Sequence, residues 1–185
     1  MNNIAKKPIP GAIRWLGGAT AAVLVVQLGL NQPLQTGAAP QGMLSFQLAT
    51  TGEKATVISA SWGNSLWPHA SLWSGFLFAA LYTTLLILLT NHLLTDRPGV
   101  REQEAGRWVR RLFVLAGLAH VVEYAVLLAN LDTPEDGLTL TATLLALANY
   151  TALLMGLAGL VVIRAARRRP LQPSEPQEPT SENGG

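Results

Sequence analysis

Four long apolar stretches, separated by short polar ones, constrain the fold of this sequence more than any other feature. They run from about residue 13 to 30, 70 to 94, 109 to 128 and 138 to 163. A bilayer core of about 30 Å is crossed by about 20 helical residues, and a helix is needed because unpaired backbone groups cannot be left in hydrocarbon. Only 13% of the residues are charged, against about 25% in soluble domains. The sequence therefore predicts an all-α protein, a bundle of four transmembrane helices.

The predicted membrane domain takes up residues 1–168, and residues 169–185 form a tail. The tail consists mainly of Pro, Gln, Glu, Ser and Gly, so it buries too little apolar surface to offset the entropy of ordering. We expect it to be disordered. The chain has no cysteine, which excludes disulfides, thiolate metal sites and thiol nucleophiles. No basic stripe interleaved with aromatic residues is present, so the bilayer and not nucleic acid is the expected partner.

Basic residues predict the orientation of the chain, because positive charge resists translocation and stays in the cytoplasm. They flank one side of the predicted helices: Lys6, Lys7 and Arg14 before the first, Arg97, Arg101, Arg107, Arg110 and Arg111 between the second and third, and Arg164, Arg167, Arg168 and Arg169 after the fourth. The first connection, residues 31–69, holds Lys54 alone, and the third is acidic, with Asp132, Glu135 and Asp136. Both termini are therefore predicted to be cytoplasmic, and residues 31–69 form an outer loop.

The outer loop contains two patterned pieces. The first is a group of apolar residues whose spacing indicates a short extended or membrane-lying segment: Met43, Leu44, Phe46 and Leu48. In the second, Thr51 is placed to cap an amphipathic helix over residues 52–62 that ends at Gly63. Ala55, Ile58 and Trp62 lie on one face of that helix. An interfacial helix over the bundle is the simpler interpretation, and a lid or a docking surface for a partner protein is the alternative.

The same loop resembles a group of uncharacterised bacterial four-helix membrane proteins. The resemblance rests on Phe46-Gln47-Leu48-Ala49-Thr50, on Trp62-Gly63 and on Phe76-Leu77-Phe78, over about 40 residues. In that group an F-E-L-A-x-T segment leads to W-G and then to a second helix of D-F-L-F type. Gln47 and Gly75 stand where the group has acids, so no chemistry based on those carboxylates carries over. The resemblance implies the fold and a bacterial inner membrane, and no activity.

Polar residues are predicted at one depth in three of the helices. Counting from the span ends places Tyr82, His120, Asn149 and Tyr150 near the bilayer midplane. On the third helix Glu123 and Tyr124 follow His120 at i+3 and i+4, so the three side chains share a face. Small residues continue this face, and small-residue faces pack against other helices in lipid. We therefore expect His120 and Glu123 to point into the bundle.

An ionisable residue in hydrocarbon costs at least about 2.5 kcal/mol, so it needs a proton, a partner or a water-filled cavity. Glu123 and His120 are placed to partner each other, either as ions or as neutral groups. Interhelical hydrogen bonding with Tyr82, Asn149 or Tyr150 is the simplest role for the pair. A site for a proton, a quinone-like molecule or a lipid is the functional alternative. A metal or haem cofactor is not expected, because His120 and Glu123 supply two ligands and the other histidines, His69 and His92, lie near opposite membrane surfaces.

Three functions agree with these patterns, and the sequence does not favour a conventional enzyme because it lacks the phosphate-loop, nucleophile-elbow and zinc-protease motifs. The preferred hypothesis is a structural or accessory subunit of a membrane assembly, with a membrane protein or a second copy of the chain as partner. The second is a membrane-embedded enzyme or lipid- or quinone-binding protein that uses His120, Glu123 and Tyr124. The third is a proton or ion pathway formed by an oligomer.

Overall fold

The computed structural model describes residues 9–95 and 100–166, and every regular element in these residues is a helix. Four long helices, α1 (Gly11–Asn31), α4 (Trp67–Leu94), α5 (Val100–Ala129) and α6 (Asp136–Ala166), are long and apolar enough to cross a membrane. Three short elements lie between α1 and α4: η1 (Gln32–Leu34), α2 (Met43–Gln47) and α3 (Gly52–Trp62). The predicted fold class is confirmed. The predicted tail lies outside the described residues.

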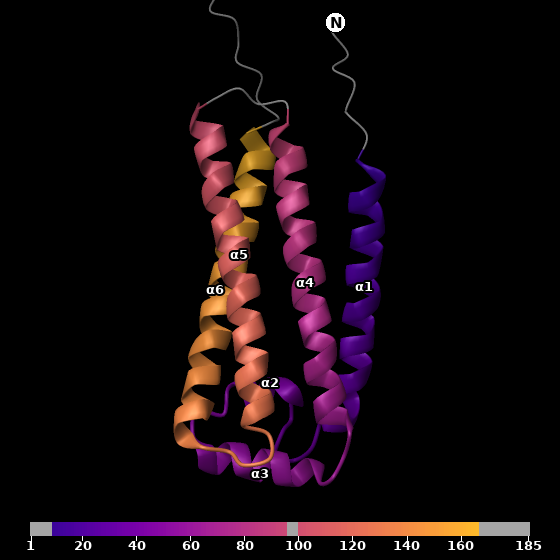
Figure 1. Ribbon diagram of the computed structural model, residues 1–185, viewed down its shortest axis with the longest axis vertical. Coiled ribbons are helices and arrows are strands. Elements are labelled where there is room, and N and C mark those ends of the chain that lie inside the picture. Colours follow the sequence, from indigo (N-terminus) through magenta and orange to yellow (C-terminus); the bar gives the residue numbers. More distant parts are fainter. Residues whose placement is uncertain (1–8, 96–99, 167–185) are drawn as a thin grey trace, which may run out of the picture.

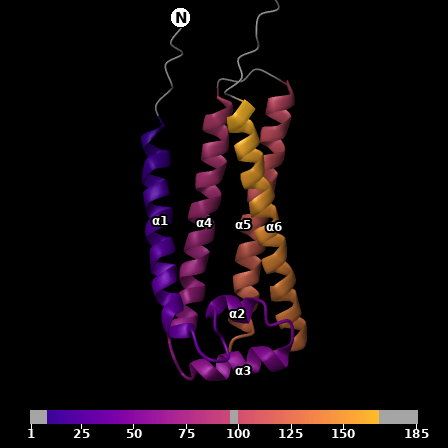
Figure 2. The same ribbon diagram turned by 180° about the vertical axis from the view of Figure 1, so that it is seen from behind.

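The long helices run side by side, with α5 packed along both α4 and α6 (Figure 1). Helix α1 stands at the edge, against α4 on the side away from α5 and α6 (Figure 2). Ile13 is the one buried residue of α1. The start of α1 and the end of α6 lie at the same end of the bundle, which we call the open end. The opposite end is covered by α2 and α3.

Close packing of the bundle depends on the small-residue faces that the sequence predicts. A Cβ atom added at any of three glycines would overlap a side chain of a neighbouring helix: Gly75 with Tyr124, Gly117 with Thr83, and Gly156 with Phe113. Lipid provides no hydrophobic driving force between helices, so their association depends on van der Waals contacts, and the small residues allow the close approach that these contacts need.

Helix α5 begins nine residues before the predicted span at Val109. The added turns contain Glu102, Glu104 and Arg107, residue types that favour a helix but not a hydrocarbon environment. Hydropathy marks only the part of a helix that lies in lipid, so the polar continuation toward the open end was missed.

Residues 32–66 form a compact cap over the other end of the bundle (Figure 1). Thr51 Oγ1 accepts a hydrogen bond from the backbone N–H of Lys54 at 3.4 Å, and Gly63 ends α3 with a φ of 58°, both as predicted. Ala55, Ile58 and Trp62 form the buried face of α3, and the helix lies across the bundle as expected. The Trp62 indole N–H donates to the Leu34 carbonyl at 2.7 Å.

The prediction of an extended segment at residues 43–48 is wrong, because residues 43–47 form the short helix α2. Met43 and Phe46 are buried beneath the cap, and Phe46 packs against Trp62 with ring centroids 5.5 Å apart. The Asn31 side chain, at the end of α1, accepts from the Met43 N–H at 2.8 Å. At the start of α6, Asp136 accepts from the Gly52 N–H at 2.6 Å. The cap is thus tied to both of the outer helices.

Candidate functional site

The predicted face of α5 lies at the centre of the bundle. His120, Glu123 and Tyr124 are 7%, 0% and 6% exposed, and Tyr82 of α4 and Asn149 of α6 beside them are 6% and 2% exposed. Their spacing on α5 places the three side chains one above another, and α4 and α6 pack against that face. Five of the six predicted site residues are therefore buried together.

Hydrogen bonds join three of these residues in a chain across the bundle. The Tyr82 hydroxyl donates to Asn149 Oδ1 at 3.2 Å, and Asn149 Nδ2 lies 3.1 Å from His120 Nδ1. An amide nitrogen can only donate, so His120 Nδ1 is the acceptor and the ring carries its hydrogen on Nε2. His120 Nε2 is buried and has no hydrogen-bond partner among the described residues.

A second chain reaches the site from the cap through Gln47, the last residue of α2. Gln47 Oε1 accepts from the Tyr150 hydroxyl at 3.0 Å, and Gln47 Nε2 donates to the Tyr124 hydroxyl at 3.2 Å. The Gln47 carbonyl accepts from Thr143 Oγ1 at 3.0 Å. Tyr150, the sixth predicted residue, is 37% exposed and so lies at the rim. One local signal marks Gln47, a single amide within an apolar piece of the outer loop, but it does not indicate which residues the amide contacts.

Glu123 lies on α5 between His120 and Tyr124, the residues at which the two series of hydrogen bonds reach this helix. Its side chain is fully buried, yet neither carboxyl oxygen has a hydrogen-bond partner among the described residues. The Asn149 side chain lies close enough to the carboxyl group for a weak hydrogen bond, but the contact does not reach ordinary hydrogen-bond geometry. His120 and Glu123 do not pair with each other, contrary to that prediction: His120 Nε2 and both carboxyl oxygens lack a partner among the described residues, while the ring stacks on Tyr124 and turns Nδ1 to Asn149.

Aromatic rings pack around His120 and Tyr124, on the face of α5 that also carries Glu123. The His120 and Tyr124 rings stack with centroids 4.4 Å apart at 26°, and Tyr82 lies 5.7 Å from His120. Phe76 and Phe78 of α4 add contacts to Tyr124 and His120 at 6.1 and 6.3 Å. All three tyrosines of the chain belong to this one site. The result is a buried cluster in which unpaired hydrogen-bonding groups lie among aromatic rings.

Metal binding has little support at this place. No group of three His, Cys, Asp or Glu side chains able to hold a metal occurs in residues 9–95 and 100–166. His69 lies near the start of α4 and His92 near its end. His120 packs beside Tyr82, near the middle of α4, so both histidines are several helical turns away from it.

Comparison with protein-family models, with curated proteins and with solved structures gives no significant match. The resemblance of the loop to bacterial four-helix proteins stays a prediction, and function is argued from the site.

Proposed function

We propose that this integral membrane protein binds a lipid-soluble molecule with a hydrogen-bonding head, a quinone or a lipid, at the cluster around Glu123. The observation that carries the proposal is the fully buried Glu123 carboxyl group with no partner on either oxygen. A buried polar group left unpaired costs about 1–3 kcal/mol. A site that served packing alone would be expected to pair it, so the geometry favours a ligand over the accessory role that the sequence favours.

The free groups define the chemistry of such a head. His120 Nε2–H is an unused donor, and the Tyr124 hydroxyl accepts from Gln47 and keeps its own hydrogen for another acceptor. Glu123 offers carboxyl oxygens beside these two donors. A molecule with a carbonyl and a hydroxyl on a flat ring would use the donors and the carboxyl group together, while its ring packs against Tyr82 and Phe78.

The surroundings favour entry from the bilayer. The cap covers one end of the bundle, and Gln47 seals the site beneath it through Tyr124 and Tyr150. Helices α4 and α6 each pack along α5 but touch each other little. Tyr150, on the α6 side, is exposed to lipid. A lipid-soluble ligand would therefore reach Glu123 sideways, past Tyr150.

The test is ligand-induced stabilisation of the purified chain in mild detergent, with a short-tailed benzoquinone as the probe. At a probe concentration of about 100 Kd, binding adds about 2.7 kcal/mol to the free energy of unfolding. We expect a saturable rise in the unfolding midpoint that Glu123→Gln and His120→Ala abolish and the control His92→Ala retains. If the ligand is instead a lipid, native mass spectrometry should show it bound to the purified wild type and absent from Glu123→Gln. If neither quinone nor lipid binding depends on Glu123, the proposal fails.

The arrangement of α1 favours a second candidate, the accessory subunit. Among the long helices, α1 packs mainly against α4. Its side chains Val25, Val26 and Leu28 are more than half exposed. In lipid such a face needs no cover, but it leaves room for a partner helix. Pull-down from gently solubilised membranes tests it, and the absence of any stoichiometric partner would count against it.

The placement of the helix ends bears on the orientation of the protein in the membrane. The start of α1 and the end of α6 share the open end, which supports placing both on one side of the membrane; the basic residues that flank this end favour the cytoplasmic side, and the bacterial inner membrane follows from the resemblance alone.

A further inference from the structure

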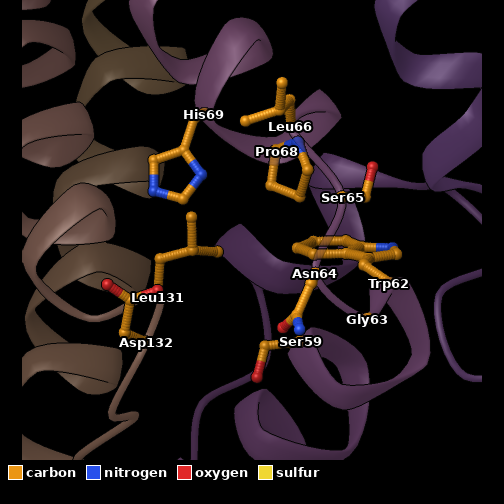
Figure 3. A pocket seen from close by; sticks show the side chains of 10 residues that line it. All are labelled: Ser59, Trp62, Gly63, Asn64, Ser65, Leu66, Pro68, His69, Leu131 and Asp132. Atoms are coloured by element: carbon orange, nitrogen blue, oxygen red, sulfur yellow. The ribbon is translucent and has the colours of Figure 1, made fainter.

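A second polar site lies at the capped end of the bundle (Figure 3). A half-open cavity of about 200 Å³ lies between the end of α3, the start of α4 and the turn between α5 and α6. Ser59 and Trp62 line it from α3, His69 from α4, and Asp132 from the turn. None of these residues contributes to the proposed quinone or lipid site, so the two sites are independent.

The charge of the cavity favours a cation. Asp132 is the one formally charged side chain of its lining, and no Lys or Arg lines it. The Asp132 side chain is exposed to solvent, and no ion pair or hydrogen bond to it occurs in the described part of the chain. Glu135 and Asp136 follow in the same turn, and residues 112–163 contain no Lys or Arg. The local potential is therefore negative, which raises the concentration of cations at the pocket.

The remaining lining suits an ammonium group on a short alkyl chain. The Ser59 hydroxyl donates to the Thr56 carbonyl at 3.2 Å, so its oxygen can accept from a ligand inside the pocket. His69 points its imidazole into the cavity (Figure 3). The apolar wall consists of Trp62, Pro68 and Leu131. An ammonium nitrogen has donors for the carboxylate and hydroxyl, and the wall accepts the carbon atoms.

Size and ligand number limit the class further. A volume of about 200 Å³ is below the roughly 300–1,000 Å³ of sites for drug-sized ligands, so the ligand has few heavy atoms. A bare metal ion is a poorer fit because His69 and Asp132 supply two ligands, and sites for transition metals use three or four.

We propose that this cavity binds a primary alkylammonium group, with its nitrogen on Asp132. Two sources offer this chemistry, a free amine in water and the ethanolamine head of a phospholipid. The cavity lies at the capped end of the apolar helices, where lipid headgroups are at hand.

The test uses the full chain in mild detergent with its histidines labelled with carbon-13. The chain has three histidines, and His69→Gln assigns the signal of interest. Titration with ethylammonium chloride should move the His69 signal saturably, and sodium chloride at equal ionic strength should not. Asp132→Asn should weaken binding by about two- to fivefold, because Asp132 is exposed to solvent and ion pairs at exposed positions are weak. The matched control Glu135→Gln, in the same turn but outside the lining, should leave binding unchanged.

Nanodiscs separate the two sources. If phosphatidylethanolamine in a phosphatidylglycerol disc moves the His69 signal and pure phosphatidylglycerol does not, the ligand is a headgroup. If only free ethylammonium moves it, the ligand is a soluble amine. A response that is linear, equal in sodium chloride, or unchanged by Asp132→Asn overturns the proposal. Because Glu123 takes no part, this outcome is independent of quinone binding.

Discussion

Replacing Glu123 with methionine should make the protein more stable. The carboxyl group is fully buried and has no hydrogen-bond partner among the described residues, and an unpaired buried polar group costs about 1–3 kcal/mol. Methionine is unbranched and of similar volume, so it fits with little strain. We therefore expect Glu123→Met to raise the free energy of unfolding by about 1–3 kcal/mol.

Reversible unfolding of the purified protein, by titrating a harsh detergent into a mild one, measures this change. Glu123→Gln serves as a second variant, because the amide keeps the shape of the side chain and remains polar; its stability should lie close to that of the wild type. Glu104→Met is the matched control. It removes an exposed carboxyl group from the same helix near the open end, so its effect should stay within about 0.5 kcal/mol.

The opposite result would refute the reasoning. If Glu123→Met lowers the free energy of unfolding by about 1 kcal/mol or more, the carboxyl group accepts hydrogen bonds in the native protein, each worth about that much. Glu123 would then be a packing element, and the accessory-subunit hypothesis would gain. A gain in stability together with a loss of quinone or lipid binding would instead show that the group is kept at a cost for function.

Two further predictions test the packing and the orientation. Gly75→Ala should lower the free energy of unfolding by about 1–3 kcal/mol, because its Cβ atom would overlap the Tyr124 ring. The control Gly18→Ala should leave stability unchanged, because nothing lies within 4 Å of the added atom. Equal effects of the two variants in thermal unfolding would contradict the packing. The chain lacks cysteine, so Lys54→Cys and Glu104→Cys each introduce a single thiol. An impermeant maleimide should label the first in intact cells and the second only after permeabilisation, and the reverse pattern would invert the proposed topology.

Local signals explain which parts of the fold the sequence could predict. The long apolar stretches predict four spans because the bilayer acts on each helix separately. Thr51 and Gly63 predict the limits of α3 because a cap depends on residues within one turn of it. The start of α5 was missed for the complementary reason. Its first turns, with Glu104 and Arg107, are held by helix propensity, and hydropathy does not report that.

The site was predicted less completely because its bonds join distant parts of the chain. The face shared by His120, Glu123 and Tyr124 follows from helical spacing. Gln47 does not, since its partners are 77, 96 and 103 residues away. The expected pairing of His120 with Glu123 depends in the same way on a distant residue, because the His120 ring turns Nδ1 to Asn149, which is 29 residues away. No rule of spacing within α5 reveals a competitor on α6.

The cap and the buried site are parts of one arrangement. Gln47 holds Tyr124 and Tyr150 with its side chain and accepts from Thr143 with its backbone, so the segment that covers the cluster also orients its phenols. Opening the cap to admit a ligand from water would break all three hydrogen bonds and expose the buried Phe46. Entry between α4 and α6, past Tyr150, disturbs at most the Tyr150 bond and leaves the bonds to Tyr124 and Thr143 intact. The least costly route to Glu123 is therefore through the lipid, which is why the proposed ligand is a lipid-soluble molecule and not a solute of the aqueous phase.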